Sequence, residues 1–171
     1  MPQQPTKYML PQEKRAYDEA VRRIETCRLK GKNTSLYRPS GDTLDLSAIG
    51  LTLLPPEIGQ LIHLHKLLLA ENQLTTLPDI IGDLTQLEEL YLSRNPLTEL
   101  PDSLWRLEWL RILKLRGNSM MALPYEIALL RNLRVLDLAG NSLSEIPDWL
   151  CNLTQLKVLD VSFNPIVKLP D

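Results

Sequence analysis

The sequence predicts an α/β fold: a right-handed solenoid with a parallel sheet on its concave face and a capping helix at its N-terminal end. Three observations predict it. A 23-residue unit recurs six times without a gap, each unit carries Leu, Asn or Pro at fixed positions, and an amphipathic stretch precedes the first unit. Because the chain of 171 residues contains one Phe, its core must come mainly from Leu and Ile, which also favours repetition.

The N-terminal segment, residues 1–40, differs in charge from the repeat region, residues 41–171. The first carries nine Lys or Arg against four Asp or Glu, and the second carries ten against seventeen. The net charge is -2, and no cluster of Lys or Arg is interleaved with aromatic residues that could stack on bases. We therefore expect no nucleic-acid partner.

A helix is predicted over about residues 11–29, with Pro11 in its first turn and Gly31 at its stop. One stripe of this helix is apolar and consists of Tyr17, Ala20, Val21, Ile24 and Cys27. We expect the stripe to cover the first repeat, because the terminal repeats of a solenoid need a cap. Its basic charge could instead suit a membrane surface or nucleic acid, but opposite charges at i, i+4 spacing favour a solvated face.

The repeat is clearest where LEELYLSRNPLTELP at residues 87–101 returns as LRVLDLAGNSLSEIP at residues 133–147. The units start at Gly41, Leu64, Leu87, Leu110, Leu133 and Leu156. Leucines alternate with variable residues near the start of each unit, as in the run from Leu90 to Ser93. This alternation predicts one short strand per unit, with one face buried.

Asn stands at the ninth position of five units, and Pro stands at the fifteenth position of all six. The asparagines are Asn72, Asn95, Asn118, Asn141 and Asn164. Stacked turns leave backbone groups pointing into the core, and an Asn amide, which both donates and accepts hydrogen bonds, can satisfy them. Pro lacks an amide donor. It therefore suits the part of each repeat that lies outside the hydrogen-bonded strands.

These positions match L-x-x-L-x-L-x-x-N-x-L-x-x-L-P-x-x-I-x-x-L-x-x, the pattern of intracellular leucine-rich repeats. The chain resembles the LPxxI type of the Ras-group and Roco-type proteins over residues 41–171, and it departs from the pattern at Ile49, where Asn is expected. The resemblance implies a horseshoe or shallow arc, with one short parallel strand per repeat on the concave side and irregular or short helical segments outside.

The sixth repeat is incomplete, because Asp171 falls at its sixteenth position. We expect its strand, within residues 156–161, to expose apolar side chains and unpaired backbone groups. Two explanations are open: the chain is the N-terminal part of a longer protein, or it self-associates through this uncapped repeat.

No arrangement of residues predicts catalysis, a metal site or a cofactor. The only histidines, His63 and His65, have no Cys or carboxylate at ligand-like spacing. The sequence contains no Gly-rich phosphate loop and no Ser or Cys nucleophile with a base partner. Cys27 falls on the buried stripe of the predicted helix, where an inert thiol is expected.

The sequence favours a cytoplasmic location, or delivery to a host cytosol if the protein is a bacterial effector. The first ten residues have no apolar stretch of the length of a secretory signal, and no window approaches a membrane span. The two cysteines, Cys27 and Cys151, lie far apart without the spacing of a disulfide framework.

Positions three, five, seven and eight of each unit should point to the concave surface, and they vary between units. Leu68 and Tyr91 should form an apolar spot there. The charged residues expected around this spot are Glu89, Arg94, Lys114 and Arg116. Aromatic anchors inside a charged rim are common in protein interfaces. The alternative is that Lys114 and Arg116 pair with carboxylates such as Glu89 and Asp137 and form a charge ladder.

Two tryptophans make the third repeat irregular. Trp105 stands where other units have Gly82 and Ala128, and Trp109 follows four residues later. They could form an exposed patch for a second partner or for oligomerisation. Alternatively, they pack on one another over the outer turn of the repeat.

The sequence therefore predicts a non-catalytic protein–protein interaction module that binds a polypeptide through its concave strand face. The alternative is the N-terminal recognition arm of a larger signalling enzyme or effector, of the GTPase or ubiquitin-ligase type, with its catalytic domain outside this chain. The resemblance implies a signalling protein, such as a small GTPase, as the partner.

Overall fold

The computed structural model describes residues 8–31 and 42–170. Gly41 and Asp171, which bound the predicted repeat region, lie outside these ranges, as do parts of the N-terminal segment. Within the described ranges one α-helix is followed by strands that alternate with short 3-10 helices. This order confirms the α/β solenoid that the repeat predicts.

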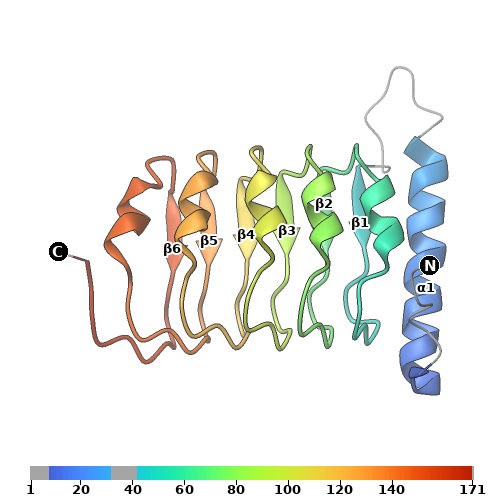
Figure 1. Ribbon diagram of the computed structural model, residues 1–171, viewed down its shortest axis with the longest axis horizontal. Coiled ribbons are helices and arrows are strands. Elements are labelled where there is room, and N and C mark those ends of the chain that lie inside the picture. Colours follow the sequence, from blue (N-terminus) through green and yellow to red (C-terminus); the bar gives the residue numbers. More distant parts are fainter. Residues whose placement is uncertain (1–7, 32–41, 171) are drawn as a thin grey trace.

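Six strands of three residues lie side by side in chain order and form one parallel sheet within the described part of the chain (Figure 1). They are β1 (Thr43–Asp45), β2 (Lys66–Leu68), β3 (Glu89–Tyr91), β4 (Ile112–Lys114), β5 (Val135–Asp137) and β6 (Val158–Asp160). Each residue of β1 to β5 pairs with the residue one repeat later, as Leu44 does with Leu67. Equivalent positions therefore form straight rows across the sheet.

The core lies on one side of the sheet and is built from Leu and Ile. The middle residue of each strand from β1 to β5 is a Leu that is at most 4% exposed. The opposite side of the core comes from one aliphatic residue in each outer helix; these are Ile58, Ile81, Leu104, Ile127 and Leu150. Each such side chain contributes about 1.5 to 3 kcal/mol when it is fully buried.

The outer side of the solenoid consists of short 3-10 helices. They are η2 (Pro56–Gln60), η3 (Asp79–Asp83), η4 (Asp102–Arg106), η5 (Tyr125–Leu129) and η6 (Asp148–Asn152). The Pro at position fifteen precedes each of them in extended conformation, with φ between −60° and −75°. The fixed φ of Pro suits the start of the outer helix, and at this position the chain does not need the amide donor that Pro lacks. Adjacent outer helices pack closely, since a Cβ at Gly82 would lie 2.5 Å from the carbonyl oxygen of Ser103.

The Asn side chains join successive repeats, as the sequence predicts. Asn95 Nδ2 donates to the carbonyls of Leu69 and Leu92 at 3.0 and 2.9 Å, and its Oδ1 accepts the amide of Leu74 at 3.1 Å. The same three bonds recur at Asn72, Asn118, Asn141 and Asn164. Each Asn thus satisfies buried backbone groups of its own repeat and of the one before it.

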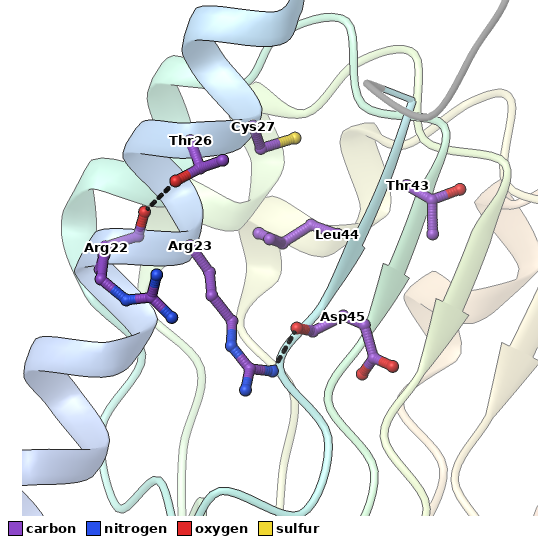
Figure 2. A pocket seen from close by; sticks show the side chains of 7 residues that line it. All are labelled: Arg22, Arg23, Thr26, Cys27, Thr43, Leu44 and Asp45. Atoms are coloured by element: carbon purple, nitrogen blue, oxygen red, sulfur yellow. Dashed lines mark hydrogen bonds between the residues drawn. The ribbon is translucent and has the colours of Figure 1, made fainter.

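The predicted helix is α1 (Pro11–Gly31), which packs against β1 and η2 and covers the first repeat (Figure 1). Its buried face consists of Ala16, Tyr17, Ala20, Ile24 and Cys27, so the apolar stripe is confirmed except at the half-buried Val21. Arg23 Nη1 donates to the carbonyl oxygen of Asp45 at 2.9 Å, and Figure 2 shows this bond across the space between α1 and β1. Because β1 has no preceding strand in the sheet, this guanidinium satisfies a backbone acceptor at its edge.

Glu19, Arg22 and Arg23 form a cluster of ion pairs on α1. Glu19 accepts hydrogen bonds from Arg22 and Arg23, and these bonds lower the pKa of the Glu19 carboxyl to about 2. Glu19 is therefore ionised at neutral pH and holds the Arg23 side chain, whose Nη1 reaches β1.

At the other end of the sheet, the outward side of β6 is apolar and exposed. Val158 and Leu159 are 50% and 40% exposed, whereas Leu136, the residue equivalent to Leu159 in β5, is fully buried. Phe163, Val167 and Leu169 are also exposed. These exposures agree with the prediction that the sixth repeat exposes apolar side chains. Across residues 8–31 and 42–170, no helix has the length and apolarity that a membrane span requires.

Candidate functional site

The concave face is defined here by positions three, five, seven and eight of the repeats. Because the middle residue of each strand points into the core, its two neighbours point to the other side of the sheet. In β2, β3 and β4 these neighbours are all half-buried; they are Lys66, Leu68, Glu89, Tyr91, Ile112 and Lys114. The register brings Leu68, Tyr91 and Lys114 into one row across three strands.

Tyr91 lies at the centre of a compact polar cluster. Its hydroxyl donates to Glu89 Oε2 at 2.9 Å, and the same oxygen lies 2.8 Å from Lys66 Nζ. The Lys66 ammonium also lies 4.9 Å from the centroid of the Tyr91 ring, which is within the range of a cation–π interaction. Three side chains from two adjacent strands thus hold one another in place.

The electrostatics of this cluster fix its protonation states at neutral pH. Burial raises the pKa of the Tyr91 hydroxyl, and its bond to Glu89 raises it further. Burial also acts to raise the pKa of Glu89, but hydrogen bonds from Lys66 and Tyr91 outweigh it and lower that pKa. The hydrogen bond to Glu89 raises the pKa of Lys66. Tyr91 is therefore neutral, while Glu89 and Lys66 are charged.

Lys66 is the residue of this cluster that the sequence analysis missed. The signal was present, because Lys66 and Glu89 occupy position three of consecutive units and carry opposite charges. In a sheet whose register equals the repeat length, such a pair must lie side by side.

The other predicted cations are paired with carboxylates. Arg94 Nη1 lies 2.8 Å from Glu71. Lys114 Nζ lies 3.3 Å from Asp137, and Arg116 Nη1 lies 3.4 Å from Asp160. The charge-ladder interpretation is therefore confirmed for Lys114 and Asp137.

Glu89 was the wrong choice of partner for Lys114 and Arg116. The register places Glu89 between Lys66 and Ile112, in a different row from Lys114. The Arg94 and Arg116 side chains are 70% and 47% exposed, so each of their ion pairs contributes at most about 1 kcal/mol and can exchange partners.

In repeats one, five and six, the Asp at position five accepts a hydrogen bond from the backbone amide two residues later. Asp45 Oδ1 accepts the amide of Ser47 at 2.8 Å. Asp137 does the same for Ala139 at 3.2 Å, and Asp160 for Ser162 at 3.0 Å. In repeats two to four, position five is the row of Leu68, Tyr91 and Lys114, none of which has a carboxylate.

The expectation of an exposed patch formed by Trp105 and Trp109 is wrong for Trp105. Trp105 is 6% exposed and belongs to the hydrophobic core, because η4 packs between η3 and η5. Trp109 follows η4 and is 56% exposed. The two residues therefore do not share a helical turn, and only one of them presents its ring to solvent.

Among the described residues, no group of three or more His, Cys, Asp or Glu side chains is arranged to hold a metal ion. His65 Nδ1 lies 2.8 Å from the carbonyl oxygen of His63 and 3.9 Å from Asp42. His65 therefore contacts one backbone oxygen and lies near one carboxylate, just before β2.

Comparison with protein families gives matches over most of the repeat region. The family model described as "Leucine rich repeat" matches residues 42–97 and 62–120. A model described as "Leucine Rich repeats (2 copies)" matches residues 131–171. No curated protein matches the chain.

Solved structures share the architecture. A leucine-rich-repeat protein of Leptospira interrogans is 42% identical over 71% of this chain and 31% of its own, with a TM-score of 0.69. The functional domain of InlJ from Listeria monocytogenes is 30% identical over 75% of this chain and 27% of its own, with a TM-score of 0.65. TLR13, solved in a complex with ssRNA13, is 29% identical over 75% and 19%, with a TM-score of 0.69. The chain thus spans 31% or less of each of these structures.

Proposed function

Because the chain belongs to the leucine-rich-repeat family, we propose that it is a non-catalytic interaction module that binds a polypeptide through the concave face of repeats two to four. The observation that carries this proposal is the row of Leu68, Tyr91 and Lys114 on three paired strands. Rigid strands present these variable side chains in fixed positions, which reduces the entropy lost on binding.

The predicted contact residues have distinct parts in this proposal. Tyr91 and Leu68 supply apolar area, and the Tyr91 ring is held by Lys66 and Glu89 before a partner arrives. Arg94, Lys114 and Arg116 supply charge around that area, in exposed or half-buried ion pairs that a partner can rearrange. An ordered aromatic anchor within a charged rim is the usual composition of an interface hot spot.

Tyr91→Ala combined with Lys114→Ala is expected to weaken partner binding by about 30-fold or more, because a hot-spot residue contributes about 2 kcal/mol. The measurement is affinity capture from cell extract with identification by mass spectrometry, followed by titration of the partner. The matched control is Tyr125→Ala, which removes an exposed aromatic ring from the outer helix η5. If the double variant captures every partner of the wild-type protein, the concave face is not the binding surface.

The proposal also includes the class of protein to which the partner belongs. The resemblance to Ras-group repeats makes a signalling protein of the cytosol, and a small GTPase in particular, the first defined bait for the titration. The bait is tested in both nucleotide states, since signalling partners of a GTPase distinguish the two.

Self-association through β6 is a second candidate function, supported by the exposed apolar side chains there. Leu159→Lys is expected to shift a dimer to monomer, because it places a charge at an exposed apolar position of β6. Sedimentation velocity over a concentration series measures the shift. Leu129→Lys is the control, since Leu129 is exposed to a similar extent on η5. A wild-type protein that stays monomeric at every concentration excludes this candidate.

A further inference from the structure

The outer side of the solenoid has a pocket beside η4 and η5. Its volume is about 440 Å³, which is in the range of small-molecule sites. The residues that line it come from the two outer helices and from the turns that follow them; they are Trp105, Glu108, Leu129, Arg131 and Asn132. The pocket therefore lies away from the concave face.

A large side chain stands at this pocket where the preceding repeats have none. Gly59 and Gly82 occupy the position equivalent to Trp105, and a Cβ at Gly59 would lie 2.2 Å from Cγ1 of Ile80 in the next outer helix. Trp105 places an indole ring there, and η4 packs less closely on η5 than on η3. The irregular third repeat thus has a pocket on the side of η4 that faces η5.

The indole N–H of Trp105 has no acceptor, although the ring is buried. Trp105 is 6% exposed, and its Nε1 has no hydrogen-bond partner among the described residues. A buried Trp donor usually has a partner, because an unpaired one destabilises the fold. An unpaired donor in the wall of a pocket indicates a site that a bound molecule completes.

Two opposite charges line the pocket without neutralising each other. Glu108 and Arg131 occupy the twenty-second position of consecutive repeats. Neither charged group has an ionic or hydrogen-bonded partner in the part of the chain that the structure describes. The side-chain amide of Asn132 donates to the backbone carbonyl oxygen of Glu108 at 2.8 Å, which leaves its Oδ1 as a further acceptor. The lining thus offers one cation, one anion and one neutral acceptor.

We infer that this pocket binds a small zwitterion of the α-amino-acid type with an apolar side chain. The apolar side chain packs against Trp105 and Leu129, and the carboxylate meets the Arg131 guanidinium. The ammonium group meets the carboxylate of Glu108 and Oδ1 of Asn132. A purely anionic ligand would be repelled by Glu108 and a purely cationic one by Arg131, so the two charges together favour a zwitterion. This inference goes beyond the proposed function, because it concerns a second site with a different ligand.

The test is a titration of the protein with L-leucine, followed in an NMR spectrum. The signals of the Trp105 indole N–H and of the Asn132 side-chain amide are expected to move in a saturable way. The indole signal of Trp149, which does not line the pocket, is the reference and should stay in place. N-acetyl-L-leucine lacks the ammonium group and L-leucinamide lacks the carboxylate. Each is expected to bind about fivefold more weakly than L-leucine, the range for one exposed ion pair.

Two substitutions assign each charge to its partner on the ligand. Arg131→Gln is expected to weaken the binding of L-leucine about fivefold and to leave that of L-leucinamide unchanged. Glu108→Gln is expected to weaken L-leucine by a similar factor and to leave N-acetyl-L-leucine unchanged. Arg134→Gln removes an exposed cation that does not line the pocket, and it should change none of these affinities. All three side chains are exposed, so the variants are expected to fold.

An L-leucine titration that leaves the Trp105 signal in place would overturn the inference. So would equal affinities for L-leucine and its two derivatives. Signals that move only with a longer peptide would also overturn it, since the pocket would then belong to a polypeptide interface. Failure of this inference is separate from failure of the proposed function, because the substitutions at Tyr91 and Lys114 test the concave face alone.

Discussion

Asn95→Leu is expected to lower the free energy of unfolding by about 3 to 5 kcal/mol, because it removes three buried hydrogen bonds at once. Leu is close to Asn in size but can neither donate nor accept. The carbonyls of Leu69 and Leu92 and the amide of Leu74 would then lie in the core without partners. Each unsatisfied buried group costs about 1 to 3 kcal/mol.

Chemical denaturation followed by circular dichroism measures this loss. Asn164→Leu is the matched control, because Asn164 makes the same three bonds but is only half-buried in the last repeat. Water can replace the side chain there, and a loss of about 1 kcal/mol is expected. Equal losses at the two positions would show that the Asn side chains do not stabilise the fold by satisfying buried groups.

Ile24→Asp is expected to release α1 from the first repeat, with a loss of about 3 to 5 kcal/mol. Ile24 is 1% exposed at the contact between α1 and the sheet, so a carboxylate at this position would be buried without a partner. Helix release would expose Leu44 and the edge of β1. We therefore expect the variant to associate at high concentration as well as to unfold more easily.

Thermal unfolding and light scattering of the same samples measure the two effects. Glu25→Ala, at the next and exposed position of α1, is the control and should change stability by less than about 0.5 kcal/mol. If Ile24→Asp does not fold, Ile24→Ala is the second variant. Its free energy of unfolding is expected to fall by about 2 to 4 kcal/mol. An Ile24→Ala protein as stable as wild type would mean that α1 does not cap the solenoid.

The fold could be predicted from the sequence because each recurring position of the repeat has one structural role. Asn at position nine satisfies buried backbone groups, and Pro at position fifteen starts each outer helix. The apolar stripe of α1 also requires only helical periodicity. Since these features are local or strictly periodic, the sequence determines them without knowledge of the neighbouring side chains.

The details of the concave face depend on which side chains meet, and the sequence does not state this directly. Glu89 has a cation on one side and Ile112 on the other, and only the register shows that Lys66 is its partner. Trp105 occupies a position that holds a small residue in other repeats, so an exposed ring was a reasonable expectation. Its burial results from the packing of η4 against both neighbouring helices, which periodicity does not determine.

The match between strand register and repeat length also bears on how such a protein can change over generations. Every residue of β2 pairs one repeat ahead, as does every residue of the other paired strands. An in-frame duplication of one whole unit would therefore insert a strand, an Asn and an outer helix that fit the existing rows. A single-residue insertion would instead shift one strand and misplace its Leu and Asn. Recombination between units can thus lengthen or shorten the concave face by whole repeats, while a point mutation changes one side chain of a repeat.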